Sequence, residues 1–135
     1  MQMSHLVVFD TNVFVSYLFP TKRISPIKIA VNQISMGDAI PVYSSPIMAE
    51  YERVLHYKKF KFSEKNIHAL LDLVLRNGLY VLPRPTSAPF SDTSDKPFYD
   101  AAVAAGAWLV TGNLRHFPKE DFIVSPREYL ERTGG

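Results

Sequence analysis

Short apolar runs separated by segments of helical length form the dominant pattern in this chain. The first run, residues 6–9, is continuously apolar and contains two valines, which is typical of a strand covered on both faces. Similar runs follow at residues 40–43, 79–82, 108–111 and 122–124. Parallel strands need crossover connections, which are usually helices, so the alternation predicts an α/β fold with a central, mainly parallel sheet of about four to five strands.

Serine–proline pairs and glycines mark the expected helix ends. Ser25-Pro26 and Ser45-Pro46 are each interpreted as an N-cap followed by a proline at the first helical position, and Gly78 is expected to end a helix. The predicted helical segments are residues 11–19, 26–37, 46–57, 63–78, 95–106 and 126–132.

Length and composition limit the classes of protein to which the chain can belong. Its 135 residues match one compact domain, residues 1–135, and the absence of cysteine excludes disulfides and thiolate-bound zinc. No apolar segment approaches the ~20 residues that span a bilayer. The N-terminus also lacks a basic region ahead of a long apolar run, so we expect a cytoplasmic protein without a membrane segment.

Four oxygen-bearing side chains lie near the carboxyl ends of the predicted strands. Asp10 follows the first strand, Glu50 lies one turn into the helix after the second, Asp95 starts a helix, and Asn113 follows the strand WLVT. Ligands of open parallel sheets bind at this edge, so we expect these side chains to converge there. Crowded carboxylates need a neutralising cation, and ligands that are all oxygen atoms favour Mg²⁺ or Mn²⁺, which usually acts on phosphate oxygens.

Each of these residues also has a purely structural interpretation. Asp10 could cap the helix that it precedes. Asp92 and Asp95 resemble a cap and an acid in the first helical turn, and Asn113, in TGNL, could be a turn residue. Their coincidence at one edge of the sheet is what favours a metal site.

Three segments resemble the successive motifs of PIN-domain ribonucleases, and together they cover nearly the whole chain. They are VVFDTNVFVSYL, SSPIMAEYERVL and DTSDKPFYDAAVAAGAWLVTGNLRHFP, and FIVSPREYLE resembles the end of VapC-like toxins of toxin–antitoxin pairs. The resemblance implies a PIN-like three-layer α/β/α fold and a ribonuclease that uses Mg²⁺ or Mn²⁺. It also implies an RNA substrate, a small antitoxin protein as a partner, and a homodimer.

The resemblance assigns the acids by position. Asp10 matches the family's first acid, with Asn12 as its usual neighbour, and Glu50 matches its glutamate. The third acid is placed at Asp95, and Asp100, in YDAAVAA, is the rival assignment.

Asn113 stands where many family members have aspartate. An amide oxygen can still bind a cation or a water, but the missing charge leaves open whether one or two metals are held. In the implied mechanism Asp10 and Asp95 hold the metal, and Glu50 ligates it or accepts a proton. Asn113 orients the water or the metal shell, and Thr111 supports a ligand carboxylate through a hydrogen bond.

Two basic clusters are candidates for contacts with RNA or with a partner protein. The segment HYKKFKF, residues 56–62, sets Lys58, Lys59 and Lys61 among aromatic residues, and Arg115 and His116 are adjacent. Lysines can contact phosphates while aromatic rings stack on unpaired bases. The alternative is a solvated helix end, where the dipole favours lysine.

The sequence leaves two other functions open and argues against a third. The chain could be a PIN-fold binding module that acts through a partner or RNA with little catalysis, or an RNA-processing enzyme instead of a toxin. A phosphatase-like or receiver-type α/β protein would need a lysine after a later strand, which WLVTGN does not supply.

Overall fold

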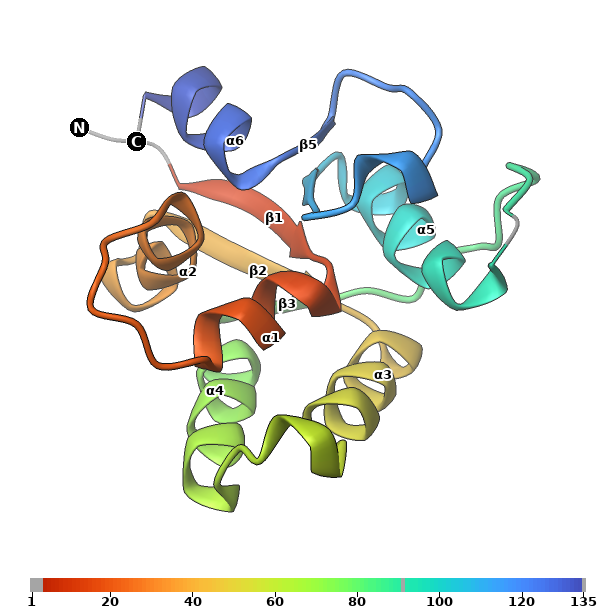
Figure 1. Cartoon of the computed structure of the whole chain (residues 1–135). Helices are drawn as coiled ribbons and strands as arrows, with labels where there is room; N and C mark the ends of the chain where they lie inside the picture. Colours follow the sequence, from red (N-terminus) through yellow and green to blue (C-terminus); the bar gives the residue numbers. More distant parts are fainter. Residues whose placement is uncertain (1–3, 91, 135) are drawn as a thin grey trace.

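The strands of the central sheet are all parallel and lie in the order β3-β2-β1-β4-β5 (Figure 1). The structure is a computed structural model and describes residues 4–90 and 92–134. The strands are β1 (His5–Phe9), β2 (Ala39–Tyr43), β3 (Leu79–Tyr80), β4 (Trp108–Val110) and β5 (Ile123–Val124).

Six α-helices and three short 3₁₀ turns connect and cover these strands in the described residues. The helices are α1 (Thr11–Leu18), α2 (Pro26–Met36), α3 (Ser45–Leu55), α4 (Glu64–Asn77), α5 (Lys96–Ala105) and α6 (Pro126–Thr133). The turns are η1 (Lys58–Phe60), η2 (Thr93–Asp95) and η3 (Leu114–His116). None of the described helices is long and apolar enough to cross a membrane.

Helices lie on both faces of the sheet, because the chain reverses its direction of travel across the strands. It moves from β1 to β2 to β3, then returns past β1 to β4, so right-handed crossovers place α5 opposite the earlier helices. Accordingly, α5 packs on β1, β2 and β4. On the other face α2 packs on β2, α6 packs on β4 and β5, and the two helices contact each other. The predicted α/β fold with a central parallel sheet is confirmed.

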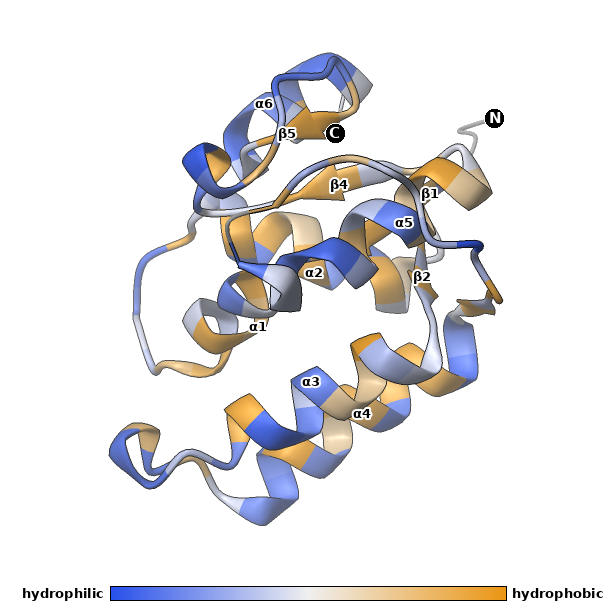
Figure 2. Ribbon diagram, turned by 90° about the vertical axis from the view of Figure 1, so that its right-hand side faces the viewer, coloured by the Kyte–Doolittle hydropathy of each residue, from blue (hydrophilic) through white to orange (hydrophobic). Residues whose placement is uncertain are grey.

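Strand β1 is the centre of the core. Val7, Val8 and Phe9 have no exposed surface, as expected for a strand covered on both faces. Figure 2 shows β4 and β5 mainly in the hydrophobic colour, whereas the helices carry both colours. Helices α3 and α4 pack side by side. The chain leaves β1 towards β2 on one side, and β4 lies on the other side of β1. The carboxyl ends of β1 and β4 therefore form the topological switch point of the sheet.

The observed element ends differ from the predicted ones by one or two residues. The N-cap of α3 is Ser44, whose side chain accepts from the N–H of Ile47, so the assignment of Ser45 as the cap was wrong. The proline rule still holds, since Pro46 lies in the first turn of the helix. The predicted strand 79–82 is paired only over Leu79–Tyr80.

Gly78 ends α4 for a different reason from the predicted one. Its φ of −95° is open to any residue, so no left-handed cap conformation is involved. A Cβ atom at this position would lie 2.4 Å from the carbonyl oxygen of Val74 and 2.6 Å from that of Pro41. Glycine is therefore needed where α4 meets β2, because two backbone segments approach too closely for a side chain.

Candidate active site

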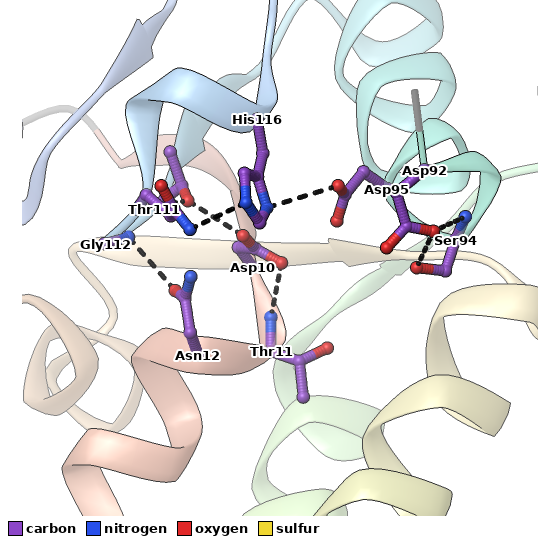
Figure 3. Close-up of polar contacts among 10 residues, drawn as sticks. Asp10, Thr11, Asn12, Asp92, Ser94, Asp95, Thr111, Gly112 and His116 are labelled. Atoms are coloured by element: carbon purple, nitrogen blue, oxygen red, sulfur yellow. Dashed lines mark hydrogen bonds and ion pairs between the residues drawn. The ribbon is translucent and has the colours of Figure 1, made fainter. Parts of the chain in front are cut away.

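Asp10 and Thr111 face each other across the switch point at the ends of β1 and β4 (Figure 3). The Thr111 hydroxyl donates to Oδ2 of Asp10 over 2.8 Å, and the backbone N–H of Thr11 donates to Oδ1 over 2.8 Å. The second bond makes Asp10 the N-cap of α1, so the capping interpretation also describes a real contact. Both oxygens of the carboxylate are thus held in place by groups from two neighbouring elements.

Burial sets the protonation behaviour of Asp10. The residue is only 6% exposed, and its burial raises the pKa of the carboxyl group above the ordinary value. The hydrogen bonds from Thr111 and Thr11 oppose this by lowering the pKa, as does the nearby His116, whereas the charge of Glu50 raises it. A buried acid near another acid is a place where a bound cation would be stabilised.

Asp95 is the second acid at this edge, and it is placed by the turn η2 at the start of α5. Its side chain is 15% exposed, and its Oδ2 atom is buried without a hydrogen-bond partner in the described part of the chain. Burial raises the pKa of Asp95 to about 6, with further upward contributions from the charges of Asp10, Asp92 and Glu50. The effect of Asp10 on this pKa places the two acids in the same electrostatic environment.

Asp92 has the capping role that the sequence suggested for it. Its Oδ1 atom accepts from the backbone N–H and the hydroxyl of Ser94, at 2.9 and 2.7 Å. These bonds lower the pKa of Asp92, and the side chain is exposed. Asp92 therefore shapes the turn that presents Asp95 and adds negative charge beside it.

His116 and Asn113 lie beside the two acids, on the segment that leaves β4. Nε2 of His116 is 3.0 Å from Nδ2 of Asn113, and Nδ1 is 3.5 Å from Oδ2 of Asp95. The backbone N–H of Asn113 donates to Oγ1 of Thr111 over 3.0 Å. His116 was expected only in a basic cluster for RNA or partner contact, whereas the structure places it within the acidic site.

Glu50 approaches the site from α3 but is bound to Arg53 on the same helix. Its side chain is 21% exposed and forms an ion pair with Arg53, one turn further along the helix. The charge of Glu50 acts on the pKa values of both Asp10 and Asp95. Glu50 is therefore near the rim, with its carboxylate turned towards Arg53.

Asp100, the rival third acid, is bound in a different place. It is 7% exposed and accepts at Oδ1 from the N–H and hydroxyl of Thr86, at 3.1 and 2.6 Å. Lys96 forms an ion pair with its Oδ2 atom at 3.1 Å. Five residues along an α-helix correspond to a rotation of about 140° away from Asp95, which explains why the two acids point to different surroundings.

Two further contacts support the ends of β1 and β4. Oδ1 of Asn12 accepts from the N–H of Gly112 over 3.0 Å, tying α1 to the turn after β4 (Figure 3). The Tyr51 hydroxyl donates to the carbonyl oxygen of Phe9, directly before Asp10. Tyr51 is buried, and helical periodicity in the sequence cannot show where a buried hydroxyl finds its partner.

The donor set fits one divalent cation with a small number of protein ligands. Within residues 4–90 and 92–134, no three His, Asp or Glu side chains lie close enough to form a ready metal-binding group. The expected convergence of Asp10, Glu50 and Asp95 is therefore incomplete, since Glu50 is held by Arg53. Mg²⁺ usually takes one or two carboxylates and completes its shell with waters. Within the described residues, Oδ2 of Asp95 is buried and accepts no hydrogen bond, although Nδ1 of His116 lies 3.5 Å away, so Asp10 and Asp95 can supply those carboxylates.

The segment HYKKFKF forms the turn η1 and the residues around it. Lys58, Lys59 and Lys61 are exposed, and Nζ of Lys59 lies 5.9 Å from the ring centre of Tyr57. Tyr57 itself is 37% exposed and accepts from Arg53, so contacts run from Glu50 through Arg53 to this segment.

The aromatic rings of this segment pack mainly on one another. Phe60 and Phe62 stack at 5.4 Å, and both have edge contacts with Phe19. Tyr57 stacks on Phe60 with ring centres 6.0 Å apart. Phe60 and Phe62 therefore stabilise the loop. Tyr57 is more exposed than either of them and is available for contact with another molecule.

Comparison with known proteins bears on both the fold and the site. No curated protein matches the chain. The family model of the PIN domain matches residues 6–115, which include Asp10, Glu50, Asp95 and Asn113. PIN domains are generally nucleases, and PIN nucleases typically use divalent metals. The chain belongs to the PIN-domain family.

Proposed function

We propose that this protein is a metal-dependent endoribonuclease whose active site lies at the carboxyl ends of β1 and β4. The observation that carries the proposal is the pair formed by the buried Asp10 and the half-buried Asp95, whose Oδ2 atom accepts no hydrogen bond within residues 4–90 and 92–134. Such a pair is unfavourable without a cation and becomes favourable once Mg²⁺ or Mn²⁺ is bound.

Asp10 and Asp95 would hold the cation, and Asn113 would add an amide oxygen. A bound divalent ion supplies polarisation of the scissile phosphate and a lower pKa for the attacking water. Thr111 keeps the Asp10 carboxylate in one orientation, which preserves its ligand geometry. Once released from Arg53, Glu50 would accept a proton or join the ligands.

The RNA would approach along α3 and η1. Arg53 lies next to Glu50, and Lys58, Lys59 and Lys61 follow on the exposed side of the turn. Lysine and arginine can hold the phosphates that an acidic metal site alone would repel. Arg115 on η3 is a second exposed cation on the Asn113 side of the site.

A toxin role within a toxin–antitoxin pair is part of the proposal. It rests on the likeness of FIVSPREYLE to the end of VapC-like toxins. In this role the protein would be one cytoplasmic domain, act as a homodimer and be inhibited by a small antitoxin protein. Co-expression with the product of a short adjacent reading frame, followed by co-purification, tests this part separately.

The nuclease proposal is tested with end-labelled single-stranded RNA and added Mg²⁺ or Mn²⁺. We expect the wild type to cleave and chelator to stop it, while Asp10→Asn and Asp95→Asn lose activity through a loss of about 10- to 100-fold or more in metal affinity. Glu52→Gln is the matched control, because Glu52 lies on the same helix as Glu50 but is exposed. Cleavage that persists in both aspartate variants would contradict the proposal.

The second candidate function is a PIN-fold binding module with little catalysis. The observation in its favour is that Glu50 is paired with Arg53, so the acids form no group of three among the described residues. Metal-independent binding of RNA or of a protein partner, with no cleavage of any RNA, would support the module instead of the nuclease.

A further inference from the structure

The side chain of Asn113 contacts a ring nitrogen of His116 through its amide nitrogen. The two atoms, Nδ2 of Asn113 and Nε2 of His116, are 3.0 Å apart. Figure 3 shows the imidazole ring between the segment after β4 and Asp95, and its other nitrogen, Nδ1, lies 3.5 Å from Oδ2 of Asp95. His116 therefore stands between an amide and an acid of the candidate site.

The chemistry of the amide nitrogen determines which tautomer of His116 is compatible with this contact. An amide NH₂ group can only donate, so Nε2 must accept and carry no proton. A neutral imidazole then has its proton on Nδ1, the nitrogen that faces Asp95. One ring thus accepts from Asn113 and directs an N–H group towards a carboxylate.

The same contact determines which end of the Asn113 amide is free. An asparagine presents an oxygen on one side and an NH₂ group on the other, and only the oxygen can bind a cation or accept from a water. Because His116 binds the NH₂ group, Oδ1 is the atom left available. The backbone of Asn113 is also fixed, since its N–H donates to the Thr111 hydroxyl that supports Asp10.

We propose that His116 is a positioning residue that orients the Asn113 amide so that its oxygen, and not its nitrogen, serves the site formed by Asp10 and Asp95. The inference rests on the proposed function, because it concerns the same metal site. An aspartate at position 113 would need no such help, since both of its terminal atoms are oxygens. His116 therefore compensates for an asymmetry that is specific to Asn113.

The first experiment measures the tautomer of His116 directly. Long-range ¹H–¹⁵N NMR spectra of the metal-free protein distinguish a protonated from an unprotonated ring nitrogen. We expect His116 to be in the Nδ1–H form, with Nε2 unprotonated, and Asn113→Ala to remove this preference. His68, exposed on α4, is the internal control and should be unaffected by Asn113→Ala. An Nε2–H tautomer of His116 in the wild type would overturn the inference.

The second experiment measures Mn²⁺ affinity by electron paramagnetic resonance, without any RNA. We expect His116→Ala to weaken Mn²⁺ binding by about tenfold when residue 113 is the protein's own asparagine. This is a typical effect of losing a group that orients a ligand. His116→Gln retains an acceptor oxygen and should recover most of that affinity. In an Asn113→Asp background, His116→Ala should change the affinity by less than about twofold, because the carboxylate is symmetric.

The outcomes separate this inference from the proposed nuclease function. Equal losses in the Asn113 and Asn113→Asp backgrounds would assign His116 a general role and overturn the inference, and so would a wild type that binds no Mn²⁺. If the coupling appears but no RNA is cleaved, the nuclease proposal fails while the positioning role stands. If metal-dependent cleavage occurs without the coupling, the nuclease stands and the positioning role fails.

Discussion

Thr111 donates a hydrogen bond of 2.8 Å to Asp10 although the two residues lie 101 positions apart in the chain. The bond joins the carboxyl ends of β1 and β4, which are neighbours in the sheet. Thr111 is fully buried, and its hydroxyl also accepts from the N–H of Asn113. One hydroxyl group thus links Asp10 to the segment that carries Asn113.

Thr111→Val should destabilise the protein and weaken its metal binding. Valine keeps the shape of threonine but leaves a buried carboxylate oxygen and a backbone N–H without this partner, at a cost of about 1 to 3 kcal/mol. We expect a lower midpoint in urea unfolding and a loss of Mn²⁺ affinity. Thr111→Ser retains the hydroxyl and is the control; equal behaviour of the valine and serine variants would show that the bond is unimportant.

The stability of the metal-free protein should fall with rising pH because of Asp95. Its pKa is about 6 in the folded protein against an ordinary value of 3.8. Between these two values the unfolded chain has already lost the proton that the folded protein retains, so stability decreases with pH until it levels off above the folded pKa.

Asp95→Asn removes this pH dependence. In chelator, the free energy of unfolding of the wild type should decrease relative to that of Asp95→Asn between pH 3.8 and about 6. Urea unfolding at a series of pH values measures the difference, and added Mg²⁺ should restore stability to the wild type alone. A difference that does not change with pH would exclude the raised pKa.

Asp100→Asn should reduce stability but leave metal binding intact. Asp100 accepts from Thr86 and pairs with Lys96, so the loss of its charge weakens buried contacts by about 1 to 3 kcal/mol. Mn²⁺ affinity should stay close to that of the wild type, in contrast to Asp95→Asn. A larger loss of Mn²⁺ affinity in Asp100→Asn than in Asp95→Asn would reverse the assignment of the third acid.

Arg53→Gln and Lys59→Gln should weaken RNA binding and its dependence on salt. If each side chain contacts one phosphate, each variant reduces the slope of log affinity against log salt by about one. Binding is measured by fluorescence anisotropy with a labelled single-stranded RNA and the Asp10→Asn protein, which should not cut it. Arg127→Gln, on the exposed first turn of α6, is the control because it removes the same single positive charge. Equal salt slopes for all three variants would place the RNA elsewhere on the protein.

The order of the elements could be predicted from the chain because each signal is local. Apolar runs of strand length, serine and proline at helix starts, and the 3.6-residue repeat of α4 depend only on neighbouring residues. The position of Asp10 at the end of a buried strand followed from the same patterns. Element ends were less well determined, as Ser44 and Ser45 show, because both residues have the chemistry of an N-cap.

What the side chains contact was decided by tertiary structure. The sequence by itself determined the parallel α/β order, the acid after β1, and the edge of the sheet to which the other acids belong. Only the folded chain decided that the charge of Asp10 acts on Asp95, that Asp100 accepts from Thr86, and that Thr111 donates to Asp10. The physical reason is that periodicity specifies which face of an element a residue occupies, whereas hydrogen bonds and pKa values depend on atoms brought close from distant parts of the chain.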